Sequence, residues 1–479
     1  MYRIYLNQVN NKYEFEELIK IFLKTSEFQL FGADEEIENS KTESSETDII
    51  IKVPDHLLVD NCGKADKKTV KNQIKRYLYD ELRKNTGITP DWGILTGVRP
   101  VKLAGELTAT QGSAEKAGRI LSDEYYLSPE KARLLLDICE LQSKILKPSS
   151  QSAVGLYIGI PFCPTRCVYC SFPSNQAKEK QIEQYLEALH REISFVAEQM
   201  SKKSWYPESI YIGGGTPTTL SAVQLDVLLS GITSSFDLTN LKEFTVEAGR
   251  PDTITSDKMQ TLKKYNVGRI SINPQSMNSA TLEKIGRAHK PEDIIEAFRL
   301  ARNSGIAMIN TDIIAGLPGE EPEDFAYTLK TVIGLEPENI TVHTLALKRA
   351  SRLKQIDSDY NYKEGQKVKK MLEFSKKLLS EAGYHPYYLY RQKQMTGNFE
   401  NVGYAKEHTD GIYNIRIMEE TQTIIAMGAG GMTKVYYPSE NRLERVANVS
   451  NFEIYIERLE EMLQRKAEHL FENSRNLQM

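Results

Sequence analysis

Three of the chain's five cysteines lie within eight residues, where Cys163, Cys167 and Cys170 have the spacing C-x3-C-x2-C. The apolar run Leu156–Ile160 precedes them and ends at a proline, which predicts a buried strand that leads into a loop. Three thiolates on one loop can hold three irons of a cubane cluster and leave the fourth iron open to a small molecule. A tetrahedral zinc site needs a fourth protein ligand, and no CxxC or CxxH pair follows Cys170. Buried structural thiols, the third interpretation, do not normally crowd one loop beside proline and aromatic residues.

The composition is that of an ordinary globular chain of 479 residues, with 40% hydrophobic and 26% charged residues and a net charge of −4. This length predicts two or three domains. The charge gives no sign of nucleic-acid binding, no apolar run has transmembrane length, and the first residues alternate like a strand, unlike a signal peptide. An odd number of cysteines with three clustered argues against a disulfide framework, so we expect a reducing cytoplasm. We also expect a monomer.

Residues 1–150 are predicted to form a separate α+β accessory domain. Tyr2–Leu6 and Ile49–Val53 are its candidate strands, and an apolar helical face is expected near Phe15. The loop 92–100 is unusual because it combines a tryptophan, two glycines and an Arg-Pro pair. It either is plain turn chemistry or presents its arginine to an anionic partner.

Residues 151–355 alternate short apolar runs with helical periods, which predicts parallel βα units. Six units in this length are too few for an eightfold barrel, so we expect an open, partial (β/α)6 barrel of the α/β class. The predicted strands are Gly155–Ile160, Ser209–Ile212, Phe244–Glu247, Arg269–Asn273, Met308–Ile314 and Ile340–Thr344. Residues 356–479 are predicted to form a smaller α+β domain that covers the substrate, with a late amphipathic helix over Phe452–Lys466.

Polar residues stand where the predicted strands end, and the carboxyl ends of parallel strands carry the site in such folds. The second strand ends in Gly213-Gly214-Gly215, whose backbone can approach a ligand closely and bind an amino group. The third ends at Glu247, a carboxylate that suits two ribose hydroxyls or is a surface residue before a turn.

The later strand ends continue this pattern. Gln275 offers an amide, and Arg287 offers a planar fork for a carboxylate. Asp312 interrupts an apolar strand and should therefore have a partner. His343, on the last strand, either faces the cavity or, as we slightly favour, satisfies the core.

The run from Leu156 to Ala346 resembles the oxygen-independent coproporphyrinogen III oxidase family of radical S-adenosylmethionine (SAM) enzymes. The motifs that carry the resemblance are Leu-Tyr-Ile-x-Ile-Pro-Phe-Cys, Gly-Gly-Gly-Thr-Pro-Thr, Gln275 twelve residues before Arg287, and Asp312 within D-x-I-x-G-L-P. The full chain resembles the coproporphyrinogen dehydrogenase-like branch of Gram-positive bacteria.

The resemblance implies that Cys163, Cys167 and Cys170 ligate a [4Fe-4S] cluster whose unique iron is chelated by SAM. One electron, from a donor such as flavodoxin or ferredoxin, then cleaves SAM to methionine and a 5′-deoxyadenosyl radical. The radical takes a hydrogen from a propionate of a porphyrinogen, and decarboxylation gives a vinyl group. The SAM-binding positions of the family, some of them for a second SAM, fall on Tyr157, Tyr169, Gly214, Gly215, Thr216, Glu247, Gln275, Arg287, Asp312 and Ala346.

One position departs from the oxidase pattern. The oxidases have a further cysteine two residues after the last ligand, and this chain has Phe172 there, which is closer to the haem-chaperone relatives. The chaperones carry His-Asn-x-x-Tyr-Trp, whereas the nearest stretch here is 400–405, Glu-Asn-Val-Gly-Tyr-Ala. Haem binding and delivery is therefore the alternative function.

Overall fold

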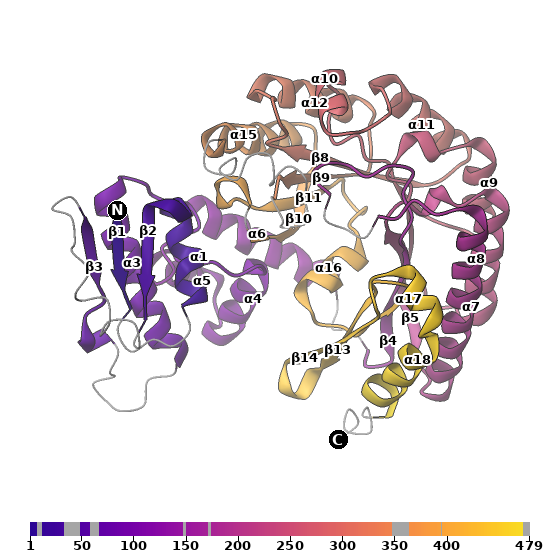
Figure 1. Ribbon diagram of the computed structural model, residues 1–479, viewed down its shortest axis with the longest axis horizontal. Helices are drawn as coiled ribbons and strands as arrows, with labels where there is room; N and C mark the ends of the chain where they lie inside the picture. Colours follow the sequence, from indigo (N-terminus) through magenta and orange to yellow (C-terminus); the bar gives the residue numbers. More distant parts are fainter. Residues whose placement is uncertain are drawn as a thin grey trace. The chain divides into compact units, whose positions relative to one another are not determined.

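The computed structural model describes residues 1–6, 12–32, 48–57, 67–146, 150–170, 174–346, 364–393 and 395–472 (Figure 1). The chain divides into a first unit of Met1–Glu140, Ser358–Gln366 and Leu389–Glu400, and a second unit of Leu141–Asp357, Lys367–Tyr388 and Asn401–Met479. None of the helices within the described ranges is both long enough and apolar enough to span a membrane. The three-domain division expected from the sequence stays a prediction.

A three-stranded parallel sheet in the order β2-β1-β3 begins the first unit. The expected apolar face is present on α1, where Phe15, Leu18, Ile19 and Phe22 are buried. The strands are β1 (Tyr2–Tyr5), β2 (Phe28–Phe31) and β3 (Ile49–Lys52), and the helices are α1 (Tyr13–Phe22), α3 (Lys67–Thr86), α4 (Pro100–Gln111), α5 (Ala114–Asp123) and α6 (Pro129–Ile145).

The loop before α4 is packed into the first unit. Trp92 is 1% exposed and donates from its indole nitrogen to Glu400 at 2.8 Å, and Glu400 also accepts from Lys131. The guanidinium of Arg391 lies 4.8 Å from the centre of the Trp92 ring and donates to the carbonyl of Leu95. These contacts explain the tryptophan of this loop, and the presentation of Arg99 and Lys102 to an anionic partner stays a prediction.

Six parallel strands form the centre of the second unit, in the order β4-β5-β6-β7-β8-β9, and they confirm the predicted partial barrel. The strands are β4 (Ala153–Ile160), β5 (Tyr206–Gly214), β6 (Glu243–Glu247), β7 (Arg269–Ser271), β8 (Met308–Ala315) and β9 (Asn339–Thr344). The helices between and after them are α7 (Glu179–Lys202), α8 (Ala222–Ser235), α9 (Ser256–Lys264), α10 (Ser279–Lys284), α11 (Pro291–Asn303), α12 (Pro322–Gly334) and α15 (Gly365–Glu381).

Strands from the last part of the chain extend this sheet at both edges, so that eleven strands join it within the described residues. At one edge β12 pairs in parallel with β4 and continues into an antiparallel hairpin, and at the other β11 pairs antiparallel to β9. The sheet is therefore open. These later elements are β10 (His385–Tyr390), β11 (Asn401–Ala405), α16 (Ile412–Glu419), β12 (Ile424–Met427), β13 (Met432–Tyr437), β14 (Arg442–Ala447), α17 (Phe452–Glu457) and α18 (Leu459–Lys466).

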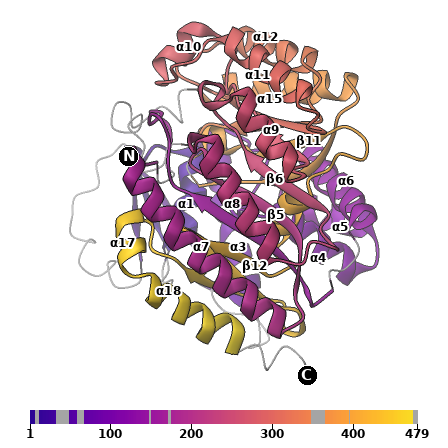
Figure 2. The same ribbon diagram turned by 90° about the vertical axis from the view of Figure 1, so that its right-hand side faces the viewer.

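The expected single helix over Phe452–Lys466 is wrong. Arg458 has φ −110° and ψ 27°, outside helical geometry, and separates α17 from α18. Both short helices lie against α7, as Figure 2 shows.

The outer face of the parallel strands forms the core. Side chains alternate between the two faces of a strand, and outward residues such as Ile158, Ile212, Val246 and Ile270 have no exposed surface. The row of α7, α8, α9 and α11 covers this face (Figure 2). The other face of each strand is thus left to line the interior of the barrel.

A buried ion pair holds the glycine loop after β12 in place. Glu192 of α7 and Lys466 of α18 are both fully buried and 2.7 Å apart. Glu192 also accepts from the backbone N–H of Gly428 at 2.7 Å, from Tyr455 at 2.6 Å and from Asn448 at 2.9 Å. Burial alone would raise the pKa of Glu192, but Lys466 and the Gly428 N–H lower it overall.

Replacing Lys466 with methionine should lower the free energy of unfolding by about 3–5 kcal/mol, because it leaves the Glu192 carboxylate buried without its cation. Urea denaturation of the variant measures this loss. Lys202→Met is the control. Lys202 forms an exposed ion pair with Glu198 on α7, the helix that carries Glu192, and exposed pairs contribute only about 0–1 kcal/mol. Equal losses in the two variants would contradict the account of this network.

Candidate active site

Polar and aromatic side chains line the inner face of the six parallel strands. Tyr157 is paired in register with Tyr211, Glu247 with Ser271, and Ser271 with Asn310, so these residues lie on one face of neighbouring strands. The residues of this inner face, from β4 to β9, are Tyr157, Tyr211, Glu247, Ser271, Asn310, Asp312 and His343. The residues predicted at separate strand ends are therefore brought together by the register of one sheet.

The cysteine loop begins directly after β4. The N–H of Cys163 donates to Asn175 at 3.1 Å, that of Val168 to Ile285 at 3.1 Å, and that of Cys170 to Cys167 at 3.2 Å. None of the three cysteines forms a disulfide, and burial raises the pKa of Cys163. Within the described residues no group of three His, Cys, Asp or Glu side chains is arranged around one metal ion. The role of the three cysteines as cluster ligands stays a prediction.

Two arginines lie beside the middle cysteine. Arg250 is 3% exposed, and its guanidinium lies 3.9 Å from the Cys167 sulfur and donates to the hydroxyl of Thr165 at 2.8 Å. A bidentate ion pair with Asp252, with nitrogen–oxygen distances of 3.0 and 3.1 Å, fixes the orientation of the Arg250 guanidinium. Arg287 interacts electrostatically with the same cysteine. Sequence reasoning missed Arg250, although its place directly after a strand-end glycine was the available signal.

The glycine run after β5 brings that strand end against the cysteine loop. A Cβ on Gly215 would lie 2.5 Å from the carbonyl oxygen of Phe162, and Gly214 has φ +112°. Only glycine fits both requirements without strain. Thr216 then lies with its hydroxyl 3.5 Å from the Cys163 sulfur. Of the predicted residues of this run, Thr216 contacts a cysteine, and Gly215 lies against the residue before that cysteine.

Glu247 lies at the end of β6 with two donors on it. Tyr211 donates to one carboxylate oxygen at 2.6 Å, and the N–H of Gly214 donates to the other at 3.2 Å. Removal from water, with a contribution from Asp312, raises the pKa of Glu247 to about 7. The carboxylate therefore changes charge near neutral pH.

If Glu247 binds the ribose of SAM, as predicted from the sequence, SAM affinity should rise about tenfold between pH 6 and pH 8, because hydroxyl donors of a ribose favour an ionised carboxylate. A carboxyl of pKa about 7 is largely protonated at pH 6 and largely ionised at pH 8. Equilibrium dialysis with labelled SAM measures the trend. In Glu247→Gln, which cannot ionise, the rise should disappear, and a rise that persists would remove Glu247 as its source.

The loop after β7 places Gln275 next to Asp312. Gln275 has φ +66°, and its N–H donates to the Asp312 carbonyl at 3.1 Å. Its side-chain oxygen is buried and has no hydrogen-bond partner in the described part of the chain. A strained backbone and an orphaned acceptor are typical of a residue that binds a ligand.

Asp312 has the partners that an acid within an apolar strand needs. Asn310 donates to it at 3.0 Å, and the Nε2 of His343 lies 3.6 Å from its other oxygen. Removal from water would raise the pKa of Asp312, but His343 and Asn310 lower it overall. The contact also corrects our preference for His343 as a core residue, because it orients an acid of the inner face.

Arg287 joins the cysteine loop to the strand ends. It donates to the carbonyls of Asn273 at 2.6 Å and Gly249 at 3.2 Å, and to the hydroxyl of Tyr169 at 3.3 Å. Its Nε is buried and, within the described ranges, has no acceptor. Ala346 stands two residues beyond β9 and is half-buried. Phe172 lies outside the described residues.

The residues present fit an iron–sulfur cluster and SAM. Three cysteine thiols on one loop, none of them in a disulfide, supply the ligands that such a cluster takes. The orphaned oxygen of Gln275 and the orphaned Nε of Arg287 offer an acceptor and a donor to a polar ligand. The glycine run at the end of β5 has no side chains, so its backbone stays accessible to the cluster and to SAM.

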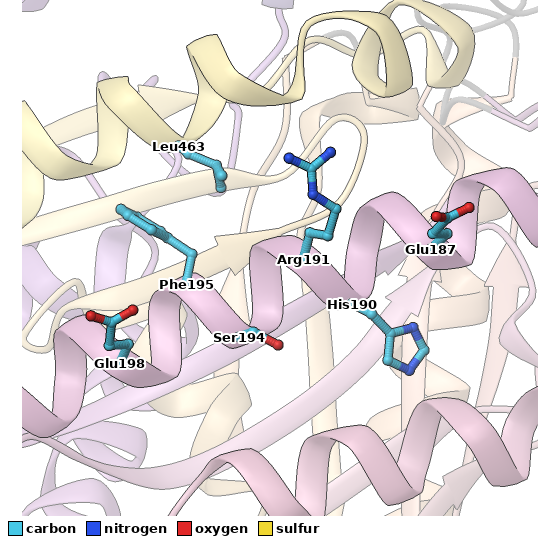
Figure 3. A pocket seen from close by; sticks show the side chains of 7 residues that line it. All are labelled: Glu187, His190, Arg191, Ser194, Phe195, Glu198 and Leu463. Atoms are coloured by element: carbon cyan, nitrogen blue, oxygen red, sulfur yellow. The ribbon is translucent and has the colours of Figure 1, made fainter.

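A separate hollow lies on the outer surface between α7 and α18 and measures about 600 Å³. Figure 3 shows Arg191 and Phe195 pointing toward Leu463, whereas His190 points away from it. It lies on the helix that covers the outer face of the sheet, and it shares no residue with the candidate site.

Residues 157–332 match the Radical SAM superfamily. A solved structure with a similar fold is coproporphyrinogen III oxidase (HemN) from Escherichia coli, a radical SAM enzyme, with a TM-score of 0.52 and 22% identity over 68% of this chain and 73% of that one. The open parallel barrel and its cysteine loop thus define a protein of the radical SAM class.

Two relatives narrow the class. The oxygen-independent coproporphyrinogen-III oxidase-like protein HemZ of Bacillus subtilis (strain 168) is 42% identical over 408 residues, which are 84% of this chain and 81% of the relative. The heme chaperone HemW of the same organism is 37% identical over 196 residues, 40% of this chain and 50% of the relative. The chain belongs to the oxygen-independent coproporphyrinogen III oxidase-like family of radical SAM enzymes, a membership that implies a [4Fe-4S] cluster and SAM.

Proposed function

We propose that this enzyme catalyses oxidative decarboxylation of coproporphyrinogen III propionates to vinyl groups, which yields protoporphyrinogen IX in haem synthesis. The observation that carries the proposal is the convergence of three cysteines and a polar inner face at the carboxyl ends of the same strands. Identity of 42% over most of the chain to an oxidase-like relative supports the substrate class.

The proposed cluster ligands are Cys163, Cys167 and Cys170. When bound, the cluster and SAM supply the one-electron chemistry that removes a hydrogen atom from an unactivated carbon. Arg250 and Arg287 place two positive charges beside Cys167, which offsets the negative charge of thiolate ligands. An external reductant such as flavodoxin or ferredoxin is part of the proposal, and so is a one-electron acceptor, which takes the electron that the substrate radical releases together with carbon dioxide. A reducing cytoplasm also belongs to the proposal.

SAM is proposed to lie along the inner face. Glu247 accepts from ribose hydroxyls, Arg287 takes a carboxylate, and the exposed backbone of Gly214 binds the amino group. A second SAM is included because some of the matching family positions bind a second SAM. The full set is Tyr157, Tyr169, Gly214, Gly215, Thr216, Glu247, Gln275, Arg287, Asp312 and Ala346.

Stacked tyrosines keep water from one side of this site. The ring of Tyr211 lies 6.3 Å from that of Tyr157 and 4.5 Å from that of Tyr413, both nearly parallel to it. Apolar enclosure of this kind strengthens electrostatic contacts and protects reactive species from solvent.

A monomer with residues 1–150 as an accessory domain completes the proposal.

Anaerobic incubation of the reconstituted protein with SAM, reductant and coproporphyrinogen III tests the function. Protoporphyrinogen IX should form together with 5′-deoxyadenosine. Formation of 5′-deoxyadenosine without a decarboxylated product would reject the substrate and keep the reaction class.

Haem delivery is the second candidate, favoured by the similarity to HemW and by the phenylalanine at position 172. It predicts stoichiometric haem transfer to an apo-acceptor without consumption of SAM. The same preparation distinguishes the two functions, because only decarboxylation consumes SAM in proportion to product.

A further inference from the structure

A cavity of about 280 Å³ opens beside the candidate SAM site. At one end it is lined by Tyr157 and Gly214, and its walls come from Tyr413, Ile417 and Met432. Met432 is 43% exposed although it is apolar. An exposed apolar wall next to the polar strand ends favours a ligand with a large apolar body.

Lys434 is the one charged side chain among the described residues that line this cavity. It stands on β13, directly opposite Ile424 of β12 and Arg445 of β14. The lysine is 13% exposed, and its ammonium lies 3.0 Å from the carbonyl of Ile417 and 3.3 Å from Glu420. Packing thus fixes a cation in an otherwise uncharged wall.

The neighbouring acid is shared between two cations. Glu420 also pairs with Arg445 at 3.1 Å, so its carboxylate keeps a guanidinium partner when the ammonium turns toward a ligand. A ligand carboxylate can therefore take the place of Glu420 at Lys434, because Glu420 stays paired with Arg445.

We propose that Lys434 binds a carboxylate side chain of the tetrapyrrole substrate, and that the cavity holds one pyrrole ring with its propionate arm. The proposal rests on the proposed function. The cavity lies just below the range of about 300–1,000 Å³ for sites of drug-sized ligands, so it accommodates one arm and leaves the rest of the macrocycle along the open side.

The bound arm is not the one that reacts. An ammonium stabilises a carboxylate but not the neutral carbon dioxide that leaves, so pairing at the reacting arm would lower the energy of the ground state more than that of the transition state. Lys434 therefore acts in binding and selects carboxylate-bearing tetrapyrroles. Its loss should raise KM and leave kcat nearly unchanged.

Lys434→Met in the reconstituted enzyme tests the assignment, because methionine keeps the apolar stem and Glu420 keeps Arg445. We expect KM for coproporphyrinogen III to rise at least about tenfold, with kcat within about twofold and SAM affinity unchanged. Lys434→Arg should restore most of the binding. The control is Lys242→Met, because Lys242 is likewise paired to a buried glutamate, Glu208, that keeps an arginine partner.

Fluorescence titration with coproporphyrin III and with its tetramethyl ester gives a readout independent of turnover. The wild type should prefer the free acid, and Lys434→Met should bind both compounds equally. Unchanged preference in that variant, or weakened SAM binding in place of weakened porphyrin binding, would overturn the role of Lys434 while the function stands. No binding of coproporphyrin III to the wild type would overturn the role of Lys434, whereas the proposed function is rejected only if coproporphyrinogen III gives no decarboxylated product.

Discussion

Cys167→Ser should lose the iron–sulfur cluster and all SAM cleavage together. Cys167 is buried between two arginines and is one of only three thiols on the loop, so no neighbouring thiol within the described residues can replace it. Serine does not supply the thiolate that such clusters take. Iron content after anaerobic reconstitution should fall from about four atoms per chain to below one, with loss of the brown colour.

Cys139→Ser is the matched control. Cys139 lies on α6, where its thiol donates to the carbonyl of Val101 at 3.2 Å, and a serine hydroxyl can make the same hydrogen bond. This variant should keep both iron and activity. A full cluster in Cys167→Ser would contradict the assignment of the ligands.

Asp312→Ala should reduce SAM-dependent turnover about 10- to 100-fold while the cluster is kept, because charged hydrogen bonds contribute about 1.5–3 kcal/mol. The substitution removes the acid that Asn310 and His343 orient on the inner face. Initial rates of 5′-deoxyadenosine formation and the visible spectrum of the cluster measure the two effects separately.

Asp410→Ala controls for the loss of any buried aspartate. Asp410 pairs with His385 at 2.9 Å, and its carbonyl lies near Arg269, the first residue of β7. It therefore has a similar histidine partner at the amino end of the strands, opposite to the candidate site. If both variants lost the same turnover, Asp312 would have no particular role in the site.

The six strands and the polar residues at their ends could be predicted from local patterns, whereas Tyr157, Tyr169, Thr216 and Ala346 were named only from the family resemblance. Apolar runs that alternate with helical periods located the six strands, and polar residues such as Glu247 and Asp312 marked where strands end. Since parallel strands align their carboxyl ends, these marks placed distant residues together without knowledge of the tertiary structure.

Features that depend on long-range packing could not be predicted in this way. The pairing of β12 with β4 and of β11 with β9 joins segments far apart in the chain, and no local pattern specifies it. In the sequence Arg250 has the pattern of a turn residue. The direction of its side chain is set by Asp252 and Thr165, and these contacts are visible only in the folded chain. The break at Arg458 arises within a continuous amphipathic pattern.

The transfer of hydrogen from the substrate tests the central claim most directly. Coproporphyrinogen III deuterated at the propionate β-carbons should be incubated anaerobically with the reconstituted enzyme, SAM and reductant. We predict that one molecule of 5′-deoxyadenosine forms for each vinyl group produced, and that each of these molecules carries one deuterium. Unlabelled 5′-deoxyadenosine, with the deuterated propionates intact, would contradict the claim that this barrel decarboxylates a porphyrinogen.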